Sequence, residues 1–442
     1  MTQETSRRPL RFLGPDASTE QLIRATAANH TQWMTEGALA SGGEVCRADG
    51  VLWAYTPGPN GGADLPFPEV PSATASETLD AILAECRKQT VGRVGCWALT
   101  PTRPRDLGAR LMARGFEWGW QPHWMALNLN ALPADFPLSD GLRIAVDDEA
   151  DWDVDNLPYY QRHTGNRFSP SHAAAHSLTG PRRQWHFGAW LDGEIAGHCS
   201  LQVTTGRRGV AGIYSMGVVP SARRKGIGRA LTLAACRFAQ ARGCHWVTLN
   251  SAADDFYESI GFALLGWGQT WWMHGPALAA PSPTQNQIAF VEAVGRGNLQ
   301  ALDQLFAQGS LPSDLDAPLP NGMTAMEIAI QPGKTASAEW LAAHGATLEV
   351  IHAWDLGWKD RVPEMLAESP ALANRRMGAW QITPLHEAVS RNDLELARLL
   401  LTARPDLTIE DAEFHSTALG WATHSGHTEM AALLEQSNAG AV

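Results

Sequence analysis

The segment over residues 210–231 combines the residue types that can hold a phosphate group. An apolar, β-branched run from Val210 to Val219 predicts a buried strand. The chain then enters a glycine-rich, cationic turn and a helical stretch that continues through Ala241. The glycines and cations of this turn are Arg223, Arg224, Lys225, Gly226, Gly228 and Arg229. A strand, a glycine-rich turn and a helix start present backbone N–H groups and a helix dipole to an anion. A G-x-G pattern alone is weak evidence, and the cations are equally consistent with a solvated face.

A second motif follows in a fixed order. Residues 245–250 (HWVTLN) predict another strand, and residues 252–262 (AADDFYESIGF) predict a helix that closes on Gly-Phe. The pattern R-x-x-G-x-G over residues 223–228, preceded by V-x-P and followed by Y-E-x-x-G-F, resembles the GNAT (Gcn5-related N-acetyltransferase) superfamily. The resemblance implies an α/β (α+β) acyl-CoA N-acyltransferase fold with a central mixed sheet, and acetyl-CoA as the cofactor.

The resemblance also implies roles for individual residues. In this superfamily a free amine attacks the acetyl thioester directly, in a gap between the strand before the loop and the strand after its helix. The cofactor-binding positions carried over to this sequence are Met216, Gly217, Val218, Arg223, Arg224, Lys225, Gly226, Ile227, Gly228, Arg229 and Asn250. Tyr257 matches the tyrosine that protonates the departing thiolate, and the alternative is an aromatic ring that only packs on the cofactor.

A general base is also needed, because an ammonium group cannot attack until it loses a proton. The strand before the loop lacks the Glu that many GNAT relatives place there. Tyr214, His198 and His186 on neighbouring strands are candidates, although each is also explained as a core or edge aromatic. A water-mediated base or an already neutral amine is a further alternative.

The acceptor is expected to lie under the first helices of this fold. These are residues 148–155 (DEADWDVD) and the following segment with Tyr159 and Tyr160. The acidic run could attract a cationic amine, or it could be an ordinary solvated helix face. The two tyrosines could stack on an acceptor ring or pack inside the protein.

The first 130 residues look like a faded copy of the same domain. A helix over residues 105–116 closes on Gly-Phe, as the later motif does, and residues 95–99 correspond to the strand 245–249. The segment that should hold the phosphate, residues 72–78 (SATASET), has neither glycines nor cations. The position equivalent to Tyr257 is Arg110 or Leu111. We therefore expect a degenerate GNAT-like domain that stands in for the second subunit of a GNAT dimer, in a monomeric chain.

The C-terminal part has an internal period. Thr383, Leu385 and Ala388 recur 34 residues later as Thr417, Leu419 and Ala422. Residues 383–388 (TPLHEA) resemble the T-P-L-H-x-A string of ankyrin repeats, in which Thr caps a helix and Pro occupies its first position. The alanines at the middle of each first helix are expected at Ala293, Ala329, Ala353, Ala388 and Ala422, with a shortened third unit. The resemblance implies an all-α solenoid of about five repeats, and an unrelated helical array is the alternative.

Two stretches separate these parts. Residues 130–137 and the Pro-rich residues 275–283 are expected to be linkers, the second unable to form a helix interior or to contribute to a core. The predicted domains are therefore 1–130 (degenerate GNAT-like), 138–275 (catalytic GNAT), 276–284 (Pro-rich linker) and 285–440 (ankyrin repeats).

Composition limits the class of protein. The 442 residues include 18 Trp and 12 Phe, too much apolar surface for a disordered chain. Six scattered cysteines without C-x-x-C spacing argue against a zinc site or a disulfide framework. The chain has no apolar run long enough for a membrane span and no secretory signal, so we expect a cytoplasmic protein.

The acidity of the chain is unevenly distributed. The net charge of −12 argues against nucleic-acid binding. Residues 285–442 contain 20 acidic and 9 basic residues, whereas residues 1–284 contain 26 acidic and 25 basic residues. A partner of the repeats is therefore expected to be basic, unless the acidic side chains only form solvated helix faces.

These observations predict an acetyl-CoA-dependent N-acetyltransferase. Its acceptor is a small-molecule or protein amine, and its ankyrin array binds a protein or regulates access. The alternative is an ankyrin interaction protein whose GNAT pair binds acyl-CoA as a non-catalytic sensor or scaffold.

Overall fold

The computed structural model describes residues 11–132, 138–146, 182–251, 254–319, 321–330, 333–377 and 380–439. The chain forms two compact units, Met1–Pro283 and Thr284–Val442. Each unit has its own buried apolar cluster. Among the described residues, no helix is both long and apolar enough to cross a membrane.

The first unit is built on one twelve-stranded sheet. Its strands are β1 (Glu44–Ala48), β2 (Val51–Tyr55), β3 (Gly62–Pro66), β4 (Arg93–Leu99), β5 (Glu117–Trp118), β6 (His123–Asn128), β7 (Leu142–Val146), β8 (Gln184–Leu191), β9 (Glu194–Val203), β10 (Ala211–Val218), β11 (Trp246–Ser251) and β12 (Ala263–His274). The helices are α1 (Thr19–Ala40), α2 (Ala75–Lys88), α3 (Leu107–Met112), α5 (Ile227–Gln240), α6 (Asp254–Glu258) and α7 (Gly275–Ala279), with short 3₁₀ turns η1 (Leu129–Ala131) and η3 (Pro220–Ala222).

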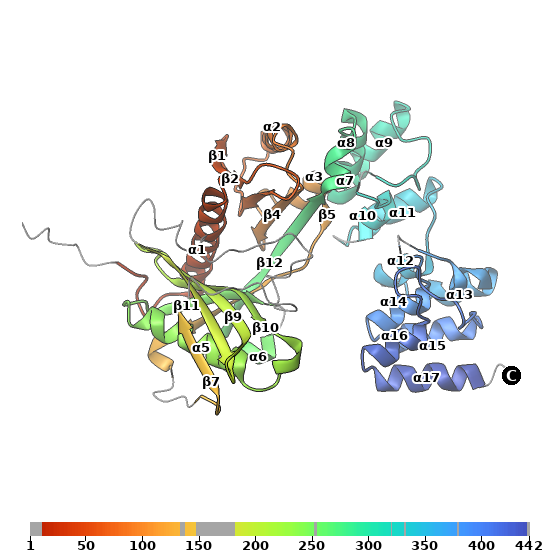
Figure 1. Ribbon diagram of the computed structural model, residues 1–442. Helices are drawn as coiled ribbons and strands as arrows, with labels where there is room; N and C mark the ends of the chain where they lie inside the picture. The colour runs from red at the N-terminus through yellow and green to blue at the C-terminus, as the bar shows by residue number, and fades with distance from the viewer. Residues whose placement is uncertain are drawn as a thin grey trace, which may run out of the picture. The chain divides into compact units, whose positions relative to one another are not determined.

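The order of the strands joins the two halves of this unit, residues 11–132 and residues 138–279. The sheet runs β1-β2-β3-β4-β12-β6-β11-β10-β9-β8-β7, and β5 pairs with β12. Strand β6 from the first half lies between β11 and β12 of the second half, paired with β11 along its whole length. Strand β12 continues past β6 to pair with β4 of the first half, and Figure 1 shows it running from one half to the other. The halves therefore exchange their last strands.

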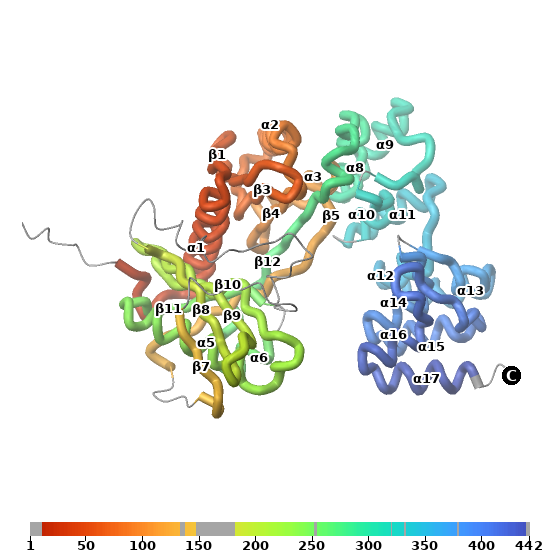
Figure 2. The backbone as a smooth tube through the Cα atoms, viewed as in Figure 1, coloured from red at the N-terminus to blue at the C-terminus, as the bar shows by residue number. Residues whose placement is uncertain are grey.

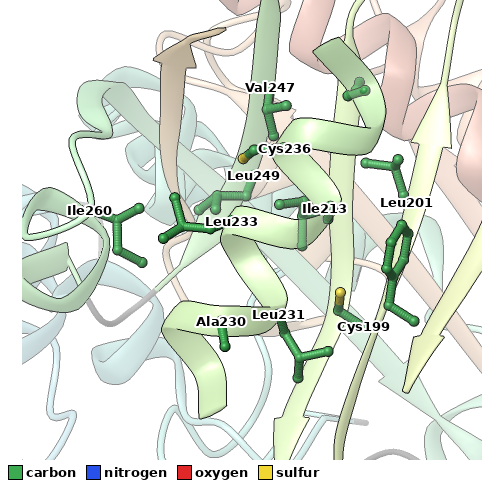
Figure 3. Packing of buried hydrophobic residues seen from close by; sticks show 14 of the residues in the cluster. Cys199, Leu201, Ile213, Ala230, Leu231, Leu233, Cys236, Val247, Leu249 and Ile260 are labelled. Atoms are coloured by element: carbon green, nitrogen blue, oxygen red, sulfur yellow. The ribbon is translucent and has the colours of Figure 1, made fainter. Parts of the chain in front are cut away.

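Helix α5 packs on the sheet beside β9, β10 and β11. Its apolar residues recur at helical spacing, so Ala230, Leu231, Leu233 and Cys236 fall on one buried face. Figure 3 shows these side chains against Cys199, Leu201, Ile213, Val247 and Leu249 of the strands. This packing fixes the start of α5 at the carboxyl end of β10.

Residues 275–283 were expected to be a linker, and the structure differs from this prediction. Residues Gly275–Ala279 form the short helix α7, with Pro276 in its first turn. Proline is compatible with this position because the first helical N–H groups have no partner inside the helix. Ala277 and Leu278 are buried, and the Leu278 carbonyl accepts a hydrogen bond from Arg87 Nε at 3.3 Å. This segment therefore contributes to the core of the first unit.

The second unit is a stack of helix pairs. Its helices are α8 (Gln285–Arg296), α9 (Leu299–Ala307), α10 (Ala325–Ile330), α11 (Thr335–Ala343), α12 (Val350–Asp355), α13 (Arg361–Glu368), α14 (Pro384–Ser390), α15 (Leu394–Thr402), α16 (Ala418–His424) and α17 (Thr428–Ala439), with the 3₁₀ turn η4 (Pro370–Asn374). Successive pairs follow each other along the stack in Figure 2. The alanines Ala293, Ala329, Ala353, Ala388 and Ala422 are each buried in the first helix of a pair. Only residues 344–349 separate α11 from α12, which accounts for the short third period.

Candidate functional site

The site is built where two parallel strands diverge. Strands β10 and β11 pair only at Ala211↔Val247 and Gly212↔Thr248, near the start of each strand. Beyond that point a cavity of about 890 Å³ opens between them. Most of its lining comes from β10, the turn after it, the start of α5, the end of β11 and α6.

A bulge in β10 turns backbone groups out of the sheet. The register with β9 shifts between Tyr214 and Gly217, and Ser215 has a positive φ of 50°. A bulge leaves its extra residue outside the ladder of hydrogen bonds. Ser215 and Met216 both line the cavity, so their main chain is available to a ligand there.

The turn before α5 forms one end of the cavity. Gly226 is the N-cap of α5 with φ of 78°, a left-handed conformation that glycine adopts at little cost. Because glycine has no side chain, it cannot cap the first N–H groups of the helix. A Cβ on Gly228 would lie 3.2 Å from Phe256 Cζ, so the Phe256 ring of α6 lies close to the main chain of α5 at this position. The uncapped helix start is a site for an anion.

Positive charge surrounds this helix start. Arg223, Arg224, Lys225 and Arg229 are all exposed. Arg223, Arg224 and Arg229 line the cavity, whereas Lys225 is not among its lining residues. Arg229 donates from Nη1 to the Ser259 carbonyl at 3.0 Å, which ties the helix start to the segment after α6. The arrangement suits a phosphate or pyrophosphate group.

The other predicted site residues lie along the same cavity. Met216, Gly217 and Val218 line it from β10, and Ile227 lines it from α5. Asn250 lines it from β11. Tyr257 on α6 is 8% exposed, lines the cavity, and contacts the rings of Phe256 and Phe262.

The three candidate bases occupy different positions. Tyr214 lines the cavity, but its hydroxyl donates to Asn29 Oδ1 at 2.6 Å and burial raises its pKa well above the usual value. It is therefore a neutral phenol, unsuited to accept a proton. His186 and His198 are buried in β8 and β9, outside the lining of this cavity. Residues 148–155, Tyr159 and Tyr160, proposed for the acceptor region, lie outside the described residues.

The corresponding place in the first half is built differently. Strands β3 and β4 stay paired through Pro66↔Trp97, at the end of β3. The side chain of Arg110, a buried residue of α3, reaches the start of α2. It donates to Ser76 Oγ at 2.6 Å and to Ser72 Oγ at 3.2 Å, and it pairs with Asp106 at 3.1 Å. A side chain thus occupies the start of α2, where the second half leaves the start of α5 uncovered.

Several lining residues were not predicted from the sequence. They are Trp120, Ile213, Ser215, Ala222, Leu249, Ser251 and Phe256. Trp120 comes from the first half of the unit, more than 90 residues before β10, so no local spacing signals it. Leu249 and Ser251 flank Asn250 on β11, and the strand period assigns them to the opposite face from Asn250, so it could not have suggested them.

Comparison with known families agrees with this geometry. Residues 148–262 match the acetyltransferase (GNAT) family, and residues 380–412 match the ankyrin repeat. The chain carries a GNAT acetyltransferase domain. The GNAT match includes the diverging strands, the turn before α5 and Tyr257, and the ankyrin match includes α14 and α15.

Individual relatives cover parts of the chain. Glucosamine 6-phosphate N-acetyltransferase of Trypanosoma brucei brucei is 38% identical over 76 residues, 16% of this chain and 52% of that protein. Mycothiol acetyltransferase of Thermobispora bispora is 29% identical over 234 residues, 51% of this chain and 64% of that protein. The chain thus spans less than two thirds of these relatives. A GCN5-related N-acetyltransferase structure from Kribbella flavida is 16% identical, with a TM-score of 0.41, over 58% of this chain and 96% of its own.

Proposed function

We propose that this protein is an acetyl-CoA-dependent N-acetyltransferase. The observation that carries the proposal is the cavity between the diverging β10 and β11 with the uncapped start of α5 at one end. The residues fit coenzyme A, because a glycine N-cap leaves the helix start uncapped and three lining arginines suit a pyrophosphate. The elongated remainder of the cofactor needs a channel such as the one between the two strands.

Each part of the chain would then have a distinct task. Bound acetyl-CoA supplies a thioester carbonyl that an amine can attack, with a thiolate as leaving group. The main chain of Gly226 to Arg229 would hold the pyrophosphate, and the bulged main chain of Ser215 and Met216 would hold the pantetheine arm and polarise the carbonyl. Tyr257 would give its Oη proton to the leaving sulfur. The acceptor amine would lose its proton to water or arrive neutral.

We also propose that residues 11–132 are a degenerate copy of the GNAT domain. The parallel pair β3 and β4 joined by α2 repeats the arrangement of β10 and β11 joined by α5. The copy would not bind coenzyme A in the usual way, since its strands stay paired and Arg110 covers the start of α2. Its role would be structural, as the equivalent of a second subunit.

The proposal is tested by binding and by turnover on the full chain. Calorimetry should detect coenzyme A binding, and a thiol reagent should detect coenzyme A release with an amine from a panel that includes glucosamine 6-phosphate, amino acids, polyamines and peptides. The double substitution Arg224→Ala, Arg229→Ala should weaken binding at least tenfold. The matched control Arg207→Ala, Arg208→Ala removes two exposed arginines of another turn and should bind as the wild type does.

A non-catalytic acyl-CoA sensor is the second candidate, favoured by the ankyrin repeat in the same chain. Tight acetyl-CoA binding without coenzyme A release for any amine or protein extract would support the sensor and contradict the enzyme. In either case we propose that the acidic repeat unit binds a basic protein partner. Salt should weaken such a complex.

A further inference from the structure

The inner end of the cavity is contacted by a helix from the other half of the unit. Tyr214 on β10 and Asn250 on β11 line the cavity on its two diverging strands. Tyr214 Oη donates to Asn29 Oδ1 at 2.6 Å, and Asn250 Nδ2 donates to His30 Nδ1 at 3.2 Å. Asn29 and His30 are consecutive residues of α1, more than 180 residues away in the chain. One turn of α1 therefore contacts both strands where they separate.

Asn29 anchors this helix to the sheet. It is fully buried, and its Nδ2 donates to the Gln202 carbonyl at 3.2 Å, Thr204 Oγ1 at 3.2 Å and the Val210 carbonyl at 3.0 Å. A Cβ on Gly212 would lie 2.1 Å from Asn29 Oδ1, so a glycine is required for the helix to come this close. Gly212 is also the last residue of β10 that pairs with β11. The side chain of Asn29 thus sits at the point of divergence.

His30 is held in a single orientation. Its ring centroid lies 4.6 Å from that of Trp97, 5.2 Å from that of Tyr214 and 5.6 Å from that of Trp124. Burial lowers the pKa of His30 to about 3, so the ring is neutral at ordinary pH. An amide nitrogen can only donate, so Nδ1 accepts from Asn250 and the ring proton is on Nε2.

We propose that Asn29 and His30 are positioning residues for the coenzyme A site, holding Tyr214 and Asn250 in place on the two strands. This inference rests on the proposed function. It gives the first half of the unit a part in the site although the parallel strands of that half, β3 and β4, stay paired to the end of β3. His30 and Asn29 act through residues that line the cavity, and they are not catalytic residues.

The main test uses calorimetric titration of coenzyme A into the full chain. His30→Leu keeps the bulk of the ring but removes the acceptor, and it should weaken binding about three- to tenfold, the effect of one hydrogen bond. Asn250→Ala should weaken binding to a similar extent. Because His30 acts through Asn250, the double variant should bind no more weakly than Asn250→Ala alone. His30→Asn keeps a polar group at the Nδ1 position and should restore part of the affinity.

A control separates positioning from stability. Thr26→Val changes a buried residue one turn earlier on α1, whose hydroxyl donates only to the Leu22 carbonyl of the same helix. It should lower the melting temperature without changing coenzyme A affinity. Ring ¹⁵N shifts of His30 should show the Nε2–H tautomer, without titration between pH 5 and 8.

The outcomes distinguish the two proposals. A wild-type chain that does not bind coenzyme A would overturn the proposed function and this inference with it. If the wild type binds and His30→Leu binds equally well, only the inference fails. Additive losses in the double variant would also contradict it.

Discussion

At the scale of single residues, Tyr257 is the proposed proton donor, and its environment supports a substitution test. Tyr257→Phe removes the hydroxyl but keeps the ring that packs on Phe256 and Phe262. Loss of a general acid should lower kcat about a hundredfold. Coenzyme A affinity should hardly change, because the aromatic contact remains. A thiol-release assay measures kcat, and titration calorimetry measures coenzyme A affinity.

The matched control for this substitution is Tyr55→Phe. Tyr55 is a buried tyrosine of β2 in the first half. The substitution Tyr55→Phe should leave kcat unchanged. It therefore separates the loss of the Tyr257 hydroxyl from the general effect of removing a hydroxyl from a buried tyrosine. Unchanged turnover in Tyr257→Phe would leave Tyr257 only the packing role.

Sequence reasoning reached the residues of the site that are set by local spacing. The turn is predicted from glycines and cations before a helix start, and Tyr257 is predicted from the resemblance to the GNAT superfamily; both line the cavity. Asn29, His30 and Trp120 could not be found in this way, since their contacts with the site exist only after the two halves pack. The bulge at Ser215 depends on the register with β9 and has no residue signature in this chain.

At the scale of elements, the turn before α5 depends on a left-handed glycine. Gly226→Ala places a Cβ on a residue with φ of 78°, which costs about 1–2 kcal/mol or shifts the turn. Shifting the turn would move the N–H groups away from the anion, so coenzyme A affinity should fall about tenfold. Titration calorimetry measures it. Gly206→Ala imposes comparable strain, at φ of 104°, in the exposed turn after β9 and should leave affinity unchanged. Equal affinities in both variants would contradict this account of the turn.

The start of helix α14 in the repeats depends on a neutral histidine, His386. His386 Nδ1 accepts the Thr383 N–H at 3.3 Å, and its Nε2–H donates to the Ser416 carbonyl of the next repeat at 3.1 Å. Burial lowers the pKa of His386. The unfolded chain, with an ordinary histidine pKa near 6.5, therefore binds more protons than the folded unit below that pH. The free energy of unfolding should fall as the pH drops below about 6.5.

This pH dependence can be measured on the full chain by urea unfolding followed by far-ultraviolet circular dichroism. Between pH 7.5 and 5.5 the wild type should lose up to about 1 kcal/mol more than His386→Gln, which cannot titrate. His424→Gln replaces an exposed histidine of α16 and should keep the pH dependence of the wild type. A wild type as stable at pH 5.5 as at 7.5 would contradict the prediction.

At the scale of the whole molecule, the exchange of last strands decides which pieces of the chain can stand alone. The sequence indicates two similar halves, because each has a helix that closes on Gly-Phe shortly before its last strand. It does not indicate that β6 pairs with β11 and β12 with β4, because a strand carries no signal for which of two similar sheets it joins. The helix α7 was missed for a related reason, since its Leu278 carbonyl is bonded by Arg87 of the first half, a residue far away in the sequence.

Two truncations test this organisation together. Residues 1–283 contain every strand of the sheet and both residues of α1 that contact the cavity, so this piece should fold and bind coenzyme A as the full chain does. Residues 138–283 lack β6, which leaves β11 with an unpaired edge, and they lack Asn29 and His30. This shorter piece should be unfolded or aggregated and should regain coenzyme A binding only when co-expressed with residues 1–137. Circular dichroism, size-exclusion chromatography and calorimetry compare the pieces. A soluble fragment 138–283 with full affinity would show that the first half is dispensable to the site. If residues 1–283 acetylate small amines but no longer acetylate a protein that the full chain acetylates, the repeats recruit that protein.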